Sequence, residues 1–414
     1  MINFVFEDSI NFKNFIASTD VNRSGINTFA ASPIAVIMLQ RTQMASLFNM
    51  KNKPKPYIIA TGVNHHPSDW IGLDKLSPFS FLNKKQLKDV QNNKAMILFD
   101  QSLEGYQTLW LWERIHTECA NYSINPNCII YVTGNLLAEE QYTEWANINN
   151  IINFINVIPY THFEADVANI SQRNNINCTF EKQITYKFKN DILSFNCLQK
   201  RLRNHRIWFY IRLFEEDLLK HGLVSMNPYS PVNIFMDGKS IESPKATAAN
   251  KSLPLLLYGK NNNEHPDDFY ITRIQDNVFL DSWVSVISEA SFADCDNELF
   301  LSEKIFKPIA CHHPFIIFGN KNSLHELRKM GYKTFNGFID ESYDTLPTFE
   351  RLDAIIESIK KIIAIKDKTL WYNSMKDILV HNYNTLISNS QKINPAIIQL
   401  ENAYTRYFKL HKNA

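Results

Sequence analysis

The sequence predicts an α/β protein made of two consecutive doubly wound, Rossmann-like domains. Its 414 residues are enough for two or three domains of about 100 to 200 residues each. Short apolar runs alternate with segments of helical periodicity, which is the order of βαβ units. The runs are apolar throughout, as is typical of parallel strands that helices cover on both faces. The pattern stops in the polar stretch 169–177 and then begins again, so this stretch is the predicted linker.

The first predicted domain covers residues 1–180. Its apolar runs predict strands at 56–62, 95–100, 128–135 and 155–160. Two helices are predicted between the later strands, at 106–119 and 138–148, because apolar residues recur there with helical spacing.

The second predicted domain covers residues 190–375, and a helical region follows at 376–414. Its predicted elements are, in order, strand 192–198, turn 199–204, helix 205–221, strand 279–288, helix 303–311, strand 314–319 and helix 323–331. Gly222 is expected to end the first of these helices, since glycine is common at that position. Ligands of open α/β sheets bind beyond the carboxyl ends of the strands, so two such domains in succession predict a ligand cleft.

The composition excludes several classes of protein. With 45% hydrophobic residues the chain is neither disordered nor low in complexity, and its six scattered cysteines include no CxxC pair. We expect no zinc site, no disulfide framework and no cofactor. Residues 1–8 lack a signal-peptide pattern, and no apolar window reaches the roughly 20 residues of a membrane span. A cytoplasmic protein is therefore expected.

The charge is balanced overall but not along the chain. The sequence has 43 basic and 42 acidic residues, yet eight basic residues and one acid lie between Lys182 and Arg212, and ten acids and two basic residues lie between Glu264 and Lys304. Two solvated faces of opposite charge would explain this pattern, and so would a local phosphate site.

A phosphate site is predicted at the turn between strand 192–198 and the helix after it. Forked guanidinium donors match phosphate oxygens, and the start of a helix favours anions. The candidate donor-binding residues are Lys200, Arg201, Arg203, His205 and Arg206. No GxGxxG or GxxxxGK[ST] loop is present, which argues against an NAD-dependent dehydrogenase and a P-loop triphosphatase. The alternative is a solvated basic helix start.

A second candidate site begins at Ser302, the predicted N-cap of helix 303–311. Glu303 suits ribose hydroxyls, and Lys304 and Lys307 suit phosphate. Ordinary helix capping would explain half of this motif.

The segments 301–319 and 324–335 resemble the donor-binding region of GT-B glycosyltransferases. The resemblance is to the fucosyltransferase-like and exostosin-like groups and their bacterial and phage relatives, in which a Ser/Thr-Glu-Lys helix start precedes a strand carrying a Pro. It implies a GT-B fold and a nucleotide-sugar donor substrate, with Glu303 on the ribose, Lys304 on the diphosphate and turn 200–206 as a second phosphate element. The resemblance is strong over about residues 192–340. This sequence departs from the family at Lys307-Pro308, where the family often has Arg.

Glycosyl transfer with inversion requires a base that deprotonates the acceptor hydroxyl, and this base is expected in the first domain. Asp100 and Glu104 follow a predicted strand and are the favoured candidates, ahead of Asp69. Asp100 could instead cap the next helix. The pairs His65-His66 and His312-His313 are poor metal ligands, because adjacent side chains diverge, so metal-independent transfer is expected.

Three functions remain open from the sequence. The first is transfer of a sugar to a surface glycan or a lipid-linked glycan. The second is a phage-type DNA glycosyltransferase that acts on hydroxymethylated bases, with the basic stretch lying along the duplex. The third is a non-catalytic nucleotide-sugar-binding protein.

Overall fold

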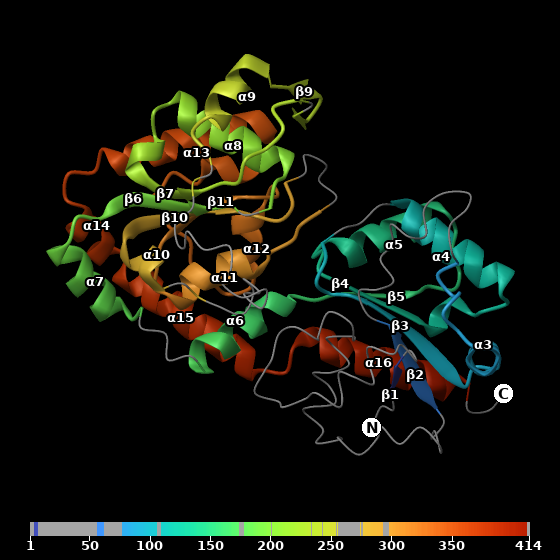
Figure 1. Cartoon of the computed structure of the whole chain (residues 1–414). Coiled ribbons are helices and arrows are strands. Elements are labelled where there is room, and N and C mark those ends of the chain that lie inside the picture. The colour runs from blue at the N-terminus through green and yellow to red at the C-terminus, as the bar shows by residue number, and fades with distance from the viewer. Residues whose placement is uncertain are drawn as a thin grey trace. The chain divides into compact units, whose positions relative to one another are not determined.

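The computed structural model of the chain contains two compact units, Met1–His162 with Ile393–Ala414, and Phe163–Lys392. It describes residues 4–6, 56–61, 77–105, 109–173, 178–199, 201–232, 234–241, 243–253, 255, 274, 276–292 and 298–411. Each unit is built on a parallel β-sheet flanked by helices (Figure 1), which confirms the α/β class with two Rossmann-like parts. The boundary lies earlier in the chain than the one expected near residue 180.

The predicted linker at 169–177 is wrong for its first five residues. These residues end helix α6 (His162–Arg173), whose Val167, Ala168, Ile170 and Ser171 are buried. Apolar residues spaced along one face hold this segment in a helix despite its Asn, Ser and Gln side chains. Residues 174–177 lie outside the described part of the chain.

The first unit contains a five-stranded parallel sheet whose strands follow one another in chain order. The strands are β1 (Phe4–Phe6), β2 (Tyr57–Thr61), β3 (Ala95–Gln101), β4 (Ile129–Thr133) and β5 (Asn156–Pro159). The connecting helices are α3 (Lys84–Gln91), α4 (Leu109–Asn121), the 3-10 turn η3 (Pro126–Cys128) and α5 (Ala138–Ile148). Helices α4 and α5 lie over one face of the sheet (Figure 1).

A helix close to the C-terminus of the sequence covers the opposite face of this sheet. Helix α16 (Pro395–Leu410) places Ile397, Leu400 and Tyr407 in the same apolar core as the strands. Its Tyr407 hydroxyl donates to Asn93 at 2.7 Å. The region predicted as one helical segment at 376–414 is thus divided, because α15 (Lys376–Gln391) belongs to the second unit.

The second unit contains a four-stranded parallel sheet in the order β11-β10-β6-β7. Its strands are β6 (Leu193–Leu198), β7 (Gly222–Ser225), β10 (Ser282–Ser288) and β11 (Phe315–Phe318). From β6 the chain first adds β7 on one side and later adds β10 on the other. Right-handed connections then place the helices after β6 and β10 on opposite faces. Figure 1 shows this for α8 (Asn204–Glu215) and α11 (Glu303–Ala310).

The remaining elements of the second unit surround this sheet. They are α7 (Phe180–Lys189), η4 (Leu219–His221), the hairpin of β8 (Phe235–Met236) and β9 (Lys239–Ser240), α9 (Ser243–Asn250), α10 (Asp276–Leu280), α12 (Ser323–Lys329), η5 (Ser342–Thr345), α13 (Thr348–Ile363) and α14 (Lys368–Ser374). Within the described ranges, every helix is too short or too polar to cross a membrane.

Strand β7 was not predicted, and the helix expected at 205–221 does not continue to Gly222, which instead follows the short 3-10 helix η4 as its C-cap. Helix α8 already stops at Glu215, and Gly222 is the first residue of β7, paired with Phe195 of β6. A Cβ atom at position 222 would lie 2.4 Å from Cζ of the Phe195 ring. Glycine is therefore required by the close approach of the Phe195 ring to position 222.

We expect Gly222→Ala to lower the free energy of unfolding by about 3 kcal/mol, because the added methyl group overpacks the fully buried Phe195 ring. Urea denaturation measures the loss. The additional substitution Phe195→Leu should recover part of it. If it recovers nothing, the close approach is not the reason for glycine at this position.

Candidate functional site

The strand order of the second unit changes direction at β6, because β7 is added on one side of β6 and β10 on the other. This order brings the two predicted donor-binding segments to the carboxyl edge of the sheet. Strands β6 and β10 are parallel neighbours, with Phe195 beside Val284 and Asn196 beside Ser285. The basic turn follows β6, and the chain leaving β10 leads to Ser302 and helix α11. This edge is the topological switch point, at which open α/β sheets bind ligands.

Arg206 connects the two segments. Its side chain is buried, and it donates to the carbonyl oxygen of Arg201 at 3.1 Å and to those of Ser288 and Glu289 at 3.2 and 2.9 Å. Burial and the nearby Arg203 lower the pKa of Arg206 to about 10, while Glu289 and Glu303 oppose that shift. The buried Arg206 side chain thus links the turn after β6 to the end of β10.

His205 is also directed inward. Its Nε2 lies 3.2 Å from the carbonyl oxygen of Glu289, and its ring stacks on Phe292 with centroids 5.5 Å apart. Burial, followed by Arg206, lowers the pKa of His205 to about 3. The imidazole is therefore neutral near pH 7 and adds no positive charge for a phosphate.

The positive charge on the outer side of the turn comes from Arg201 and Arg203, which are both exposed. Arg203 is the N-cap residue of α8 and has extended backbone angles, and its side chain makes no capping hydrogen bond. The first amides of α8 favour an anion, and these two exposed guanidinium groups belong to the turn that precedes them. Lys200 lies outside the described residues.

The α11 side of the edge carries a linked group of polar side chains. Ser302 is the N-cap, as predicted, and its Oγ accepts from Lys304 N at 3.4 Å and from Lys304 Nζ at 3.1 Å. Lys304 Nζ also donates to Glu303 Oε1 at 2.8 Å. Burial alone would raise the pKa of Glu303, but Lys304 and Lys307 outweigh it and hold this pKa below its usual value. Glu303 is therefore ionised and is an acceptor suited to ribose hydroxyls.

Lys307 follows Glu303 by one helical turn. Burial lowers the pKa of Lys307 to about 8, Lys304 lowers it further, and Glu303 and Asp166 oppose the shift. If Lys307 contacts the donor, as the sequence predicts, it loses its charge as the pH rises through about 8.

We accordingly expect the affinity for a nucleotide sugar to fall by up to about tenfold between about pH 7 and pH 9, because the diphosphate diester does not titrate there and one charged contact is lost. Calorimetric titration across this range measures the change, and Lys307→Met should abolish it. A pH-independent affinity in the wild-type protein would remove Lys307 from the donor contacts.

Sequence reasoning missed one residue of this edge, Glu289. It directly follows β10, is 0% exposed and accepts hydrogen bonds from Ser302 and from the amide of Ala290. Burial raises its pKa, although Lys304 and the Ser302 hydrogen bond oppose the shift. The available signal was a carboxylate immediately after an apolar strand.

The two predicted base candidates lie at the carboxyl edge of the first sheet. Asp100 is 0% exposed, and its Oδ1 accepts from the amide of Ser102 at 3.0 Å, so it shapes the loop after β3. Glu104 is partly exposed, and its carbonyl oxygen accepts from the amide of Gly134 at 3.0 Å. The Glu104 carboxylate is thus the more accessible of the two, and its backbone is fixed between the ends of β3 and β4.

The pair His312-His313 does not form a metal site with other described residues. His313 bonds through Nδ1 to Ser285 Oγ at 2.9 Å and through Nε2 to the carbonyl oxygen of Ser282 at 2.8 Å, and His312 bonds to the carbonyl oxygen of Cys178. The described residues contain no group of three or more His, Cys, Asp or Glu side chains placed to bind a metal ion. His65, His66 and Asp69 lie outside them.

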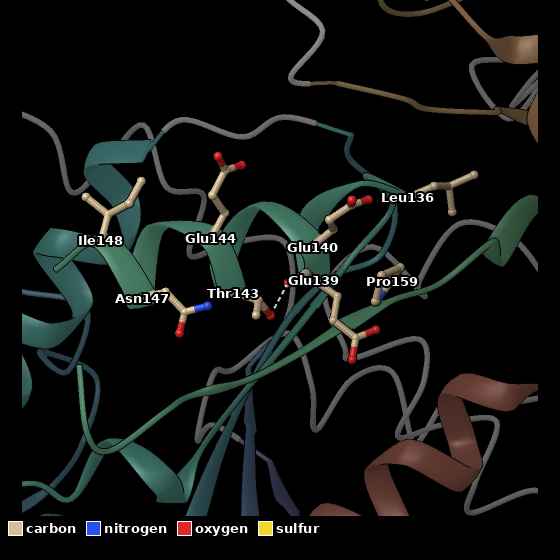
Figure 2. A pocket seen from close by; sticks show the side chains of 8 residues that line it. All are labelled: Leu136, Glu139, Glu140, Thr143, Glu144, Asn147, Ile148 and Pro159. Atoms are coloured by element: carbon tan, nitrogen blue, oxygen red, sulfur yellow. Dashed lines mark hydrogen bonds between the residues drawn. The ribbon is translucent and has the colours of Figure 1, made fainter. Parts of the chain in front are cut away.

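A shallow hollow in the first unit has a different character. Figure 2 shows it along α5, lined by Leu136, Glu139, Glu140, Thr143, Glu144, Asn147, Ile148 and Pro159. Three carboxylates in this lining disfavour an anionic ligand. The hollow is therefore a poor place for a diphosphate.

Comparison with known proteins gives a general structural similarity. No family model matches the chain, and no curated protein matches it. A UDP-forming α,α-trehalose-phosphate synthase from Burkholderia vietnamiensis is similar in structure, with a TM-score of 0.43 and 9% identity over 91% of this chain and 79% of the synthase. For the corresponding synthase from Burkholderia xenovorans the TM-score is 0.45, with 8% identity over 96% and 82% of the two chains.

Proposed function

We propose that the protein is a glycosyltransferase that uses a nucleotide-sugar donor, whose diphosphate binds at the edge formed by β6 and β10. The observation that supports this most strongly is the strand order, in which β6 and β10 are neighbours. It brings the turn with Arg201 and Arg203 to the same edge as Ser302, Glu303 and Lys304. A shared edge with two helix starts and several cations suits a diphosphate.

The residues at this edge divide the work of donor binding. Arg201, Arg203 and Lys304 stabilise the negative charge that develops on the departing nucleoside diphosphate, in place of a metal ion. The ionised Glu303 accepts the ribose hydroxyls. Arg206 and His205, which are buried and bonded to Glu289, hold the basic turn in position.

The acceptor hydroxyl requires a base, and we assign this role to Glu104. A partly exposed carboxylate on a loop anchored at both ends can remain aligned with a reacting hydroxyl. Direct deprotonation of the acceptor would lead to inversion at the sugar. We propose a surface glycan or a lipid-linked glycan as the acceptor.

The basic stretch between Lys182 and Arg212 gives little support to a DNA acceptor. Lys187 is buried and donates to the carbonyl oxygens of Phe279, Leu280 and Ser282. Arg212 pairs with Asp353 at 2.6 Å. Side chains that are occupied in this way do not form a continuous phosphate-binding surface.

Thermal unfolding in the presence of nucleoside diphosphates and their sugars tests the proposal. A bound donor stabilises the folded protein by mass action, and about 3 kcal/mol is expected when its concentration is 100 times the dissociation constant. The ligand that stabilises most would then be assayed for transfer and for slow hydrolysis. If none of these ligands shifts the transition, the chain is not a nucleotide-sugar enzyme; binding without any turnover would favour the non-catalytic alternative.

A further inference from the structure

Glu289 is the point at which the two halves of the proposed donor site meet. Its carbonyl oxygen accepts from Arg206 Nη2 at 2.9 Å and lies 3.2 Å from His205 Nε2, so its backbone contacts the α8 side. Its carboxylate points toward α11, where Oε1 accepts from the amide of Ser302 at 3.2 Å and Oε2 accepts from the Ser302 hydroxyl.

The hydroxyl of Ser302 transmits this contact to Lys304. A serine hydroxyl has one proton to donate and two lone pairs that accept. Because the proton is directed to Glu289 Oε2, the lone pairs face Lys304, whose Nζ lies 3.1 Å away. The same ammonium group contacts Glu303 Oε1 at 2.8 Å. The buried carboxylate thus sets the orientation of the hydroxyl that holds Lys304.

The neighbouring strand leaves space for this carboxylate. Gly319 follows β11, and a Cβ atom there would lie 3.0 Å from Cβ and 3.1 Å from Cγ of Glu289. Contacts this short would require the Glu289 side chain to move. Glu289 is thus bonded through its backbone to the first turn of α8 and through its carboxylate to Ser302, and Gly319 after β11 leaves room for its side chain.

We propose that Glu289 is a positioning residue that aims Lys304 and Glu303 at the donor and keeps the basic turn in register with them. This inference rests on the proposed function, because it concerns the same diphosphate site. Glu289 does not itself contact the donor, since its carboxylate is buried and its bonds are directed to Ser302 and Ala290.

The test compares Glu289→Gln, Lys304→Ala and the double variant by calorimetric titration with inorganic pyrophosphate. Glutamine keeps the size of the side chain but directs an amide group at the Ser302 hydroxyl or at the amide of Ala290. We expect Glu289→Gln to weaken pyrophosphate binding by about five- to tenfold. Because Glu289 acts through Lys304, the double variant should bind no more weakly than Lys304→Ala alone.

Ser302 provides a second route to the same answer if Glu289→Gln fails to fold. Ser302→Ala should weaken binding by a similar factor, and Ser302→Thr, which keeps the hydroxyl, should restore it. Gly319→Ala should also weaken binding by displacing the Glu289 side chain.

Asp344→Asn is the matched control. Asp344 is another buried carboxylate of the second unit, and it accepts from the amides of Leu324 and His325 at the start of α12. Its replacement should lower stability and leave the affinity for pyrophosphate unchanged.

The possible outcomes distinguish the positioning role of Glu289 from the proposed function of the site. If Lys304→Ala weakens binding but Glu289→Gln binds like the wild-type protein, the positioning role is overturned and the proposed function stands. Additive losses in the double variant would likewise overturn it. If the wild-type protein binds neither pyrophosphate nor any nucleoside diphosphate, both claims fail.

Discussion

Replacement of Glu104 by glutamine is expected to lower the turnover of sugar transfer by about 10²- to 10⁴-fold, the usual contribution of a positioned general base. The affinity for the donor should change little, because the predicted donor-binding residues belong to the second unit. Turnover and donor affinity are measured separately, by transfer assays at saturating donor and by calorimetric titration.

Asp100→Asn is the comparison for Glu104→Gln. Since the Asp100 carboxylate is completely buried and accepts from Ser102, its replacement should lower the free energy of unfolding by about 1 to 3 kcal/mol. A large loss of turnover with unchanged stability in Asp100→Asn, together with full activity in Glu104→Gln, would transfer the role of base to Asp100. Full activity and stability in both variants would place the base elsewhere.

Replacement of Arg203 or Lys304 by alanine is expected to raise the dissociation constant of the nucleotide sugar by about 10- to 100-fold. Each side chain supplies a charge-assisted hydrogen bond to the diphosphate, which contributes about 1.5 to 3 kcal/mol. The fold should be unaffected, because Arg203 is exposed and Lys304 is only partly buried. Calorimetric titration with the donor measures the effect.

Arg328→Ala and Lys329→Ala are matched controls in the same unit. Both residues are surface cations on α12, paired with Glu341 and Glu326, and neither lies on the proposed donor edge. They should bind the donor like the wild-type protein. If all four alanine variants lose affinity equally, the effect is one of overall charge and the assignment of Arg203 and Lys304 is wrong.

Most strands and helices could be predicted from local sequence, because their signals lie within the elements themselves. The apolar spacing in 138–148 predicts a helix with the bounds of α5, and the run at 192–198 predicts β6 to within one residue. Strand β7 has only four residues and lacks a strong apolar pattern. Its formation depends on pairing with β6, whose partner residues lie 27 positions earlier in the chain, so a local pattern could not indicate it.

In the candidate site, too, local sequence predicted some features and only the packing determined others. The capping role of Ser302 was predictable, because an N-cap is set by the few residues that follow it. The inward burial of His205 and Arg206 was not. They share one basic segment with the exposed Arg201 and Arg203, and only packing against Glu289 distinguishes the two pairs. Glu289 was missed because the partners that place it in the site, His205, Arg206 and Ser302, lie 13 or more residues away in the chain.

The sequence by itself determined the α/β class, most of the elements and the position of the two segments that carry the candidate donor-binding residues, since each depends on residues close together in the chain. Only the tertiary structure decided that β6 and β10 are neighbours, that α16 covers the first sheet, and which basic residues face outward. The physical reason is that hydrogen bonds such as those from Asn196 to Ser282 and Ser285 join strands more than 80 residues apart, and no local pattern specifies such pairing.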